Sequence, residues 1–291
     1  MILQQLINGL ALGMVYALIA VGYSLVFGIL RLVNFSHGSV YAFGAHIAMV
    51  FVGMQFGIIP ALILSIIFTG VLGIAIDKIA LAPLRAKKSK AIAALITTIG
   101  VSYIIQNLLM IVFGSQTKFF PKLFDYGNVH IGGVSISTTQ LFIFGVSLAL
   151  LLLLTFIIRK TKIGLAMRAV EQNPKAANLM GIDVDFVITF TFFLGGASAA
   201  IAGTLISGYY QVVYPTMGFL AGLKAFSAAV LGGIGILHGS IVGGLIVGVS
   251  ESYAAAFLGG GYRDAVAFVI LIIVLLVKPT GLFGKKGVVK V

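Results

Sequence analysis

Long runs of uncharged, mainly apolar residues divide the chain into segments of the length that a membrane helix needs. Such a helix crosses roughly 30 Å of hydrocarbon with about 20 residues. Strands of a membrane β-barrel would be about 10 residues long with strict alternation, whereas these runs are longer and uniformly apolar. We therefore expect an all-α, polytopic transmembrane helical bundle. The runs predict eight apparent spans: Met1–Leu30, two within Leu32–Ile76, Ala91–Thr117, Leu141–Ile158, Phe186–Ser207, Ala225–Ser250 and Ala265–Val277.

The composition agrees with this pattern and excludes several classes of protein. Charged residues make up 9% of the 291 positions, against roughly 25% in a typical soluble domain. The mean hydropathy is +1.17. A water-soluble fold cannot bury so much apolar surface, which excludes a soluble enzyme or a nucleic-acid-binding domain despite the net charge of +12. The chain has no cysteine, so we expect neither a disulfide framework nor a thiolate metal site.

The positive charges gather in three segments that flank the predicted spans. Short loops rich in Lys and Arg stay on the cytoplasmic side of a membrane. Three spans before the first segment then place the N-terminus outside, in the cytoplasmic (inner) membrane of a bacterium or archaeon. We expect a single transmembrane domain, residues 1–291, with a cytoplasmic loop at 159–185. The three segments contain Arg85, Lys87, Lys88 and Lys90; Arg159, Lys160, Lys162, Arg168 and Lys175; and Lys278, Lys285, Lys286 and Lys290.

The same charge rule conflicts with the number of spans near the C-terminus. Three spans after Lys175 would leave the C-terminal lysines outside. A broken or paired span between Thr216 and Phe257 would resolve the conflict and make nine spans. This segment is rich in glycine, which tolerates bends and close helix contacts. Small residues at four-residue spacing also indicate tight helix packing elsewhere, at Gly9/Gly13, Thr69/Gly73, Ala199/Gly203, Gly239/Gly243 and Gly244/Gly248.

The basic loop contains a very short predicted helix. Asn173 suits the N-cap, Pro174 suits the first helical position, and Gly181 suits the position just past the end. Isolated helices shorter than roughly 12–15 residues are marginal in water. This helix must therefore dock on something, either the ends of the bundle or a protein in the cytoplasm.

The loop and its surroundings resemble a known family. Lys175, Ala176 and Ala177 followed by Gly181 resemble the Glu-Ala-Ala-x-x-x-Gly core of ABC-importer permeases, with Lys175 in place of Glu. Longer stretches resemble the LivH-like permeases of branched-chain amino acid importers, at Asn8–Tyr41, Arg168–Ile182, Ala225–Gly235 and Lys278–Gly284. In that family the loop forms the coupling helix that contacts the ATPase subunit. The resemblance implies an ATPase-coupling role for Arg168, Glu171, Asn173, Pro174, Ala176, Ala177 and Gly181.

The resemblance implies a permease subunit that moves branched-chain or related small amino acids inward. It also implies cytoplasmic ABC ATPase subunits, a second permease subunit in a hetero- or homodimer, and an extracytoplasmic substrate-binding protein as partners, with no nucleic acid. The chain has no P-loop, so we expect no cofactor of its own, and ATP bound by partner subunits. Alternatives are a related permease for urea or short amides, a self-sufficient secondary transporter or channel for a small polar solute, and, third, a membrane enzyme.

A few polar residues lie within or beside the apolar segments and are candidates for a translocation pathway. Three of them also have a structural interpretation. His37 suits a turn at the membrane interface beside Arg31, and Gln106 suits hydrogen bonds between helices. Glu251 would be costly at the bilayer centre and should face protein, water or a cation such as Arg263. No catalytic triad can be assembled, so no catalytic residue is assigned. The pathway candidates are Asn34, His37, Tyr41, Gln106 and Glu251.

Overall fold

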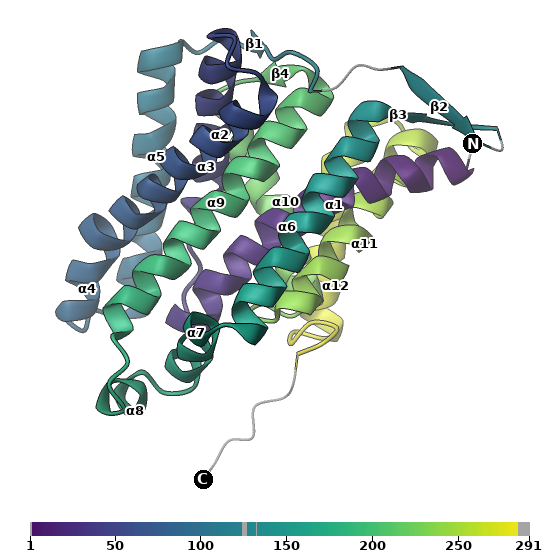
Figure 1. Cartoon of the computed structure of the whole chain (residues 1–291). Helices are drawn as coiled ribbons and strands as arrows, with labels where there is room; N and C mark the ends of the chain where they lie inside the picture. Colours follow the sequence, from purple (N-terminus) through teal and green to yellow (C-terminus); the bar gives the residue numbers. More distant parts are fainter. Residues whose placement is uncertain (1, 124–126, 132, 285–291) are drawn as a thin grey trace.

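The computed structural model describes residues 2–123, 127–131 and 133–284, and these form a bundle of helices with short strands at one end (Figure 1). Lys285, Lys286 and Lys290 of the third basic segment lie outside the described residues. The helices are α1 (Ile2–Leu30), α2 (His37–Gly53), α3 (Ile58–Ala75), α4 (Ala82–Ala86), α5 (Ala91–Phe113), α6 (Thr138–Lys160), α7 (Lys162–Gln172), α8 (Pro174–Leu179), α9 (Val184–Tyr210), α10 (Met217–Gly232), α11 (Leu237–Phe257) and α12 (Arg263–Val277).

Short irregular helices and strands complete the chain. A π-helical segment, Ile76–Leu81, joins α3 to α4, and a 3₁₀ turn, Gly260–Tyr262, precedes α12. Strand β1 (Lys118–Phe119) pairs antiparallel with β4 (Val212–Val213), and β2 (Asn128–Ile131) pairs antiparallel with β3 (Val134–Ser137). Both strand pairs lie at the end of the bundle opposite α4, α7 and α8 (Figure 1). We call the end with α4, α7 and α8 the basic end, because it carries Arg85, Arg159 and Lys175.

The helical spans confirm an all-α, polytopic membrane protein. Within the described residues, seven helical segments are long and apolar enough to cross a membrane: Ile2–Leu30, Ile58–Ala86, Ala91–Phe113, Thr138–Lys160, Val184–Tyr210, Leu237–Phe257 and Gly260–Val277. Helices α2 and α10 are shorter, with 17 and 16 residues. At a rise of 1.5 Å per residue each is roughly 25 Å long, less than the full hydrocarbon thickness.

One predicted span is wrong. Ala225–Ser250 is not a single helix, because α10 ends at Gly232 and α11 begins at Leu237. Gly233 and Gly235 adopt φ angles of 103° and 88°, a backbone region that favours glycine, and the chain reverses there. The paired span that the charge pattern required between Thr216 and Phe257 is therefore a helical hairpin made by α10 and α11.

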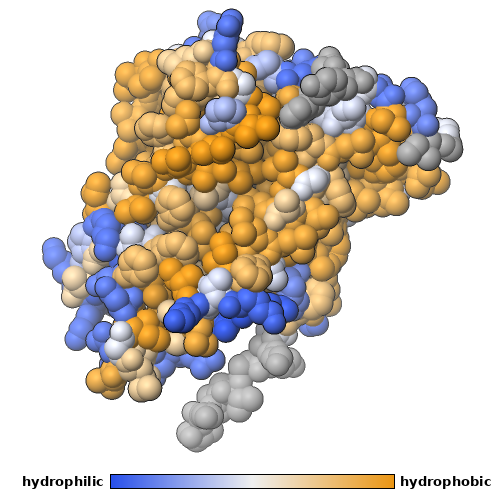
Figure 2. All heavy atoms as spheres, viewed as in Figure 1, coloured by the Kyte–Doolittle hydropathy of each residue, from blue (hydrophilic) through white to orange (hydrophobic). Residues whose placement is uncertain are grey.

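Glycines hold the central helices together, as their spacing predicted. Gly9 and Gly13 of α1 face Gly244 and Gly248 of α11, so two small-residue motifs pack directly on each other. A Cβ atom added at Gly9 would lie 2.6 Å from the Val249 Cα, closer than real side chains come. Helices α1 and α9 are mostly buried, whereas most residues of α5, α6 and α12 are partly or fully exposed. Figure 2 shows hydrophobic residues over the middle of the molecule and hydrophilic residues toward both ends, including the basic end.

Helices α2 and α10 both begin inside the bundle. His37, the first residue of α2, lies against Gly22 of α1, about 12 Å along the axis before α1 ends. The start of α10 lies against the start of α2, where Gly38 and Gly218 approach so closely that a Cβ on either would overlap the carbonyl of the other. This contact places the first turns of two short helices side by side in the interior.

Candidate functional site

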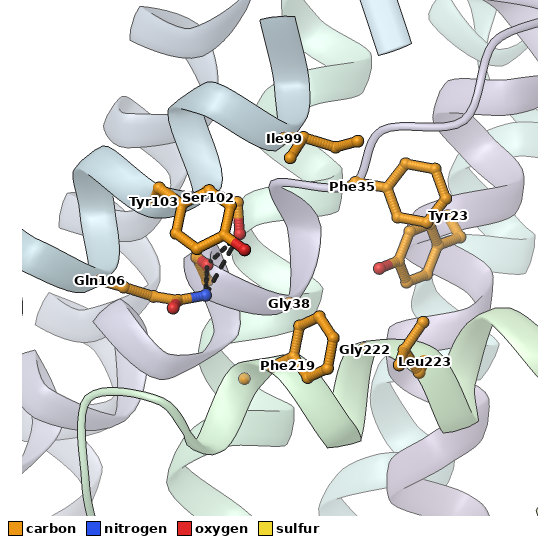
Figure 3. Close-up of a pocket in the computed structure, with 12 residues that line it drawn as sticks. Tyr23, Phe35, Gly38, Ile99, Ser102, Tyr103, Gln106, Phe219, Gly222 and Leu223 are labelled. Atoms are coloured by element: carbon orange, nitrogen blue, oxygen red, sulfur yellow. Dashed lines mark hydrogen bonds between the residues drawn. The ribbon is translucent and has the colours of Figure 1, made fainter. Parts of the chain in front are cut away.

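Two cavities lie on opposite faces of α10. The first, which we call the neutral cavity, has a volume of about 210 Å³ and is enclosed by α1, α2, α5 and α10 (Figure 3). Of its lining residues, none carries a formal charge. They are Tyr23, Phe35, Gly38, Ser39, Ile99, Ser102, Tyr103, Gln106, Gly218, Phe219, Gly222 and Leu223.

The polar groups of the neutral cavity bond to one another. The Gln106 Nε2 donates to Ser39 Oγ at 3.1 Å and to Ser102 Oγ at 3.3 Å, and the two serine hydroxyls lie 2.7 Å apart. Figure 3 shows this group on the α5 side of the cavity, away from Tyr23. The three side chains join α2 to α5 by hydrogen bonds without placing a charge inside the bundle.

The second cavity, which we call the charged cavity, has a volume of about 410 Å³. It lies between α10 and helices α1, α2, α9, α11 and α12, near β4 and away from the basic end. Its wall mixes tyrosines, aliphatic side chains and four ionisable groups. The lining residues are Tyr16, Tyr41, Ile206, Tyr210, Val212, Tyr214, Met217, Leu220, Ala221, Lys224, Glu251, Arg263 and Asp264.

The four ionisable groups form one network. The Lys224 Nζ lies 3.0 Å from Glu251 Oε1 and 2.6 Å from Asp264 Oδ1. The Arg263 Nε lies 3.0 Å from the same Glu251 oxygen, and its guanidinium lies 5.2 Å from the centre of the Tyr210 ring. The Tyr16 hydroxyl donates to the other Glu251 oxygen at 2.7 Å. Two cations face two carboxylates, so the network is balanced in formal charge.

The network has a buried side and an open side. The Glu251 and Lys224 side chains are 1% and 7% exposed, whereas those of Arg263 and Asp264 are 32% and 47% exposed. Burying an isolated charge in a membrane protein is costly, and pairing it with an opposite charge reduces that cost. The arrangement therefore holds paired charges within reach of a cavity that opens on the Arg263 and Asp264 side.

The structure separates the predicted pathway residues into three locations. Glu251 and Tyr41 line the charged cavity, and Gln106 lines the neutral cavity. Asn34 and His37 line neither of them. The Asn34 Oδ1 accepts hydrogen bonds from the Ser36 N–H at 3.1 Å and the Ser36 hydroxyl at 2.6 Å, which shapes the turn into α2.

His37 is inside the protein rather than at a membrane interface. It is 3% exposed, and its ring packs edge-on against Tyr23 with 4.8 Å between ring centres. The predicted ionic partnership of Glu251 with Arg263 is present. Sequence reasoning missed Lys224, which directly precedes the predicted span Ala225–Ser250, and its partner Asp264. A single lysine within an apolar segment could have revealed Lys224, because charged residues in such segments usually have a function or an ionic partner.

The short helix α8 has the predicted caps. The Asn173 Oδ1 accepts from the backbone N–H groups of Lys175 and Ala176 at 3.0 and 3.1 Å. Pro174 is the first helical residue, and Gly181 follows the helix with φ 82°. These contacts explain why six residues hold a helical turn at the basic end, beside α7 (Figure 1).

The loop exposes some of its apolar side chains and buries others. Leu179 and Met180 are 88% and 83% exposed, whereas Ala177 is buried against the chain itself. The Arg168 guanidinium donates to the Ile158 carbonyl at the end of α6. Glu171 is half-buried beside α1, and this burial raises the pKa of its carboxyl, an effect that the charge of Arg31 opposes. Arg168 and Glu171 therefore attach α7 to the bundle.

Comparisons with known proteins cover nearly the whole chain. A family model described as "Branched-chain amino acid transport system / permease component" matches residues 5–275. The chain is 42% identical to the high-affinity branched-chain amino acid transport system permease protein LivH of Salmonella typhimurium and to that of Escherichia coli, covering 99% of this chain and 97% of each relative. It is 42% identical to the corresponding protein BraD of Pseudomonas aeruginosa, covering 99% and 98%.

Proposed function

The chain belongs to the family of branched-chain amino acid transport system permease components, and we propose that it is the membrane permease subunit of an ATP-binding-cassette importer for branched-chain or related small amino acids. The family match over residues 5–275 carries this proposal. As a permease component of the inner membrane, the chain forms the translocation pathway and transmits conformational change from the ATPase subunits, which bind the ATP. The urea or amide permease and the self-sufficient transporter are the alternatives that experiment must exclude.

The distribution of basic residues supports an orientation with the N-terminus outside. The basic end carries residues from two of the three Lys- and Arg-rich segments and also α8. Helix α1 ends there, since Gly28 lies beside Glu171. With the basic end in the cytoplasm, the first residues of α1 lie on the opposite side of the membrane.

Residues 159–185 are proposed as the loop that couples to the ATPase. Leu179 and Met180 supply the exposed apolar contact, and the caps at Asn173 and Gly181 hold them in place. A helix this short is not stable alone, so docking on the bundle and on a partner both stabilise it. A larger or charged side chain at Ala177 would disturb the packing of the loop itself, because this position is buried, and would not isolate the partner contact.

The proposed complex contains further subunits. An extracytoplasmic substrate-binding protein delivers the amino acid, ATPase subunits bind at the basic end, and a second permease completes the pore. The transport-system names of the relatives support these partners. Co-purification with tagged permease subunits separates a homodimeric pore from a heterodimeric one.

Reconstitution tests the proposed function. Vesicles containing the complete importer should accumulate labelled leucine only with ATP, and excess valine or isoleucine should compete. Competition by urea or acetamide instead would favour the amide permease. Leucine uptake by this chain alone, without ATPase subunits or ATP, would identify a self-sufficient transporter and overturn the proposal.

The coupling loop makes a separate prediction. Leu179→Asp places a charge at an apolar contact, and we expect ATP-driven uptake and ATPase co-purification to fall by roughly tenfold, which corresponds to about 1.4 kcal/mol of lost interaction. The matched control is Leu282→Asp, another exposed leucine, which follows α12 at the same end. Equal effects of both variants would remove α8 from the coupling mechanism.

A further inference from the structure

We propose that the charged cavity is the binding site for the amino acid during its passage, with Lys224 and Arg263 facing the α-carboxylate and Asp264 and Glu251 facing the α-ammonium. This inference rests on the proposed function and names the residues through which that function would recognise its substrate. Helices α1, α10 and α11 pack on one another through glycine contacts and do not need these ion pairs to associate. The proposal therefore gives the charged network a role in binding rather than in helix packing.

The charge balance of the network suits a zwitterion. An amino acid carries one positive and one negative group, and the network contains two of each. The ligand can therefore exchange partners with the Lys224–Asp264 pair without leaving a net charge buried. A ligand with only one charged end would leave an unpaired group in the cavity, which is costly in a membrane protein.

The open side of the network provides access. Asp264 and Arg263 are partly exposed, while Glu251 and Tyr16 form the buried back of the network. The Tyr16 hydroxyl and the Lys224 ammonium hold Glu251 from two directions. The groups at the back thus keep their geometry, and the more exposed Asp264 and Arg263 are the first of the four charged groups to meet the ligand.

The remaining wall suits an aliphatic side chain. Ile206, Met217, Leu220 and Ala221 line the cavity beside the charges. The volume of about 410 Å³ falls within the roughly 300–1,000 Å³ of small-molecule sites, which combine an apolar wall with a few polar groups. The neutral cavity is about half as large and has no charged lining residue, so it offers no oppositely charged partner for either end of a zwitterion.

The absence of cysteine from the chain makes a direct test available. Ala221→Cys introduces the only thiol of this chain into the charged cavity, and Ser102→Cys introduces one into the neutral cavity as the matched control. Each variant is assembled into the complete importer in vesicles, with binding protein and ATP. A maleimide then modifies the thiol, and mass analysis of this chain follows the rate.

We expect leucine at about ten times its Kd for the charged cavity to slow modification of Ala221→Cys by roughly tenfold, because mass action then leaves about one site in ten empty. Leucine should leave Ser102→Cys unchanged. Neither 4-methylpentanoate, which lacks the ammonium, nor 3-methylbutylamine, which lacks the carboxylate, should protect Ala221→Cys at the same concentration. Protection of Ser102→Cys alone, equal protection of both thiols, or protection of neither overturns the proposal.

A charge-balanced variant tests the network itself. Lys224→Gln combined with Asp264→Asn removes one cation and one anion and leaves Glu251 beside Arg263. In the Ala221→Cys background, we expect protection to require at least about tenfold more leucine. The control, Asp77→Asn with Arg85→Gln, removes another ion pair, of a buried carboxylate with a partly exposed arginine outside the cavity, and should leave protection unchanged. Unchanged protection in the Lys224 and Asp264 double variant would contradict the assignment.

Uptake by the wild-type importer separates the two proposals. ATP-driven leucine uptake without protection of Ala221→Cys overturns the cavity assignment and leaves the proposed function standing. Protection without uptake supports the binding site and overturns the transport function.

Discussion

The two cavities differ in chemistry although one helix separates them. Met217, Leu220, Ala221 and Lys224 recur at the spacing of one helical face and line the charged cavity, whereas Gly218, Phe219, Gly222 and Leu223 line the neutral one. The neutral cavity satisfies its amide and hydroxyl groups with one another across two helices. The charged cavity needs residues from four helices to balance its charges. Charged side chains inside an apolar bundle therefore need partners from several helices that are distant in the sequence. Neutral polar side chains need only a hydrogen-bond partner on an adjacent helix.

The largest expected effect comes from breaking the charge balance. Glu251→Gln leaves Lys224 and Arg263 with fewer partners, and we expect a loss of stability toward the lower end of the about 3–5 kcal/mol that removal of one member of a buried ion pair costs. Asp264→Asn acts on a half-exposed carboxylate and should cost at most about 1 kcal/mol. Thermal unfolding of the purified permease measures both. Equal costs would mean that burial does not distinguish the two sides of the network.

The next effect concerns the close contact between α2 and α10 in the wall of the neutral cavity. Gly38→Ala places a methyl group against the Gly218 carbonyl, and we expect a loss of about 1–3 kcal/mol because backbone must move. Gly53→Ala, on the same helix with open space around it, should be neutral or stabilising by up to about 1 kcal/mol. Thermal unfolding and leucine uptake follow both variants. A stable, active Gly38→Ala protein would show that α2 and α10 can separate without cost.

The smallest effect is expected in the neutral cavity. Gln106→Leu removes the hydrogen bonds to Ser39 and Ser102 but leaves these serines able to bond each other. Hydrogen bonds between membrane helices average about 0.6 kcal/mol, so unfolding should shift only slightly. Leucine protection in the charged cavity should be unchanged. A loss of protection would couple the two cavities and weaken their contrast.

Local sequence signals predicted much of the fold. Uncharged runs located most of the helices, and the Asn173, Pro174 and Gly181 pattern predicted α8 with its caps. The turn at Gly233–Ile236 was harder to predict, because the apolar sequence continues through it. Only two glycines with positive φ distinguish it from the helices on either side. The charge conflict at the C-terminus placed such a break between Thr216 and Phe257, but it did not identify the residues at which the chain turns.

The candidate site was predicted only in part. Glu251 and its partner Arg263 were identified because a carboxylate in apolar text needs a cation. Lys224 was overlooked, since a single lysine between two apolar runs also looks like the edge of a span. Asn34 and His37 have polar side chains, yet they shape and pack the start of α2 rather than line either cavity.

The sequence by itself determined the class of protein, the helices and the capped loop, because hydropathy and caps depend on residues close together in the chain. Only the tertiary structure decided that the segment between Thr216 and Phe257 is paired rather than broken, that Ala177 is buried while Leu179 is exposed, and that Tyr16 meets Glu251 across 235 positions. The physical reason is that a buried charge is stable only beside its partners, and those partners come from helices that packing alone brings together.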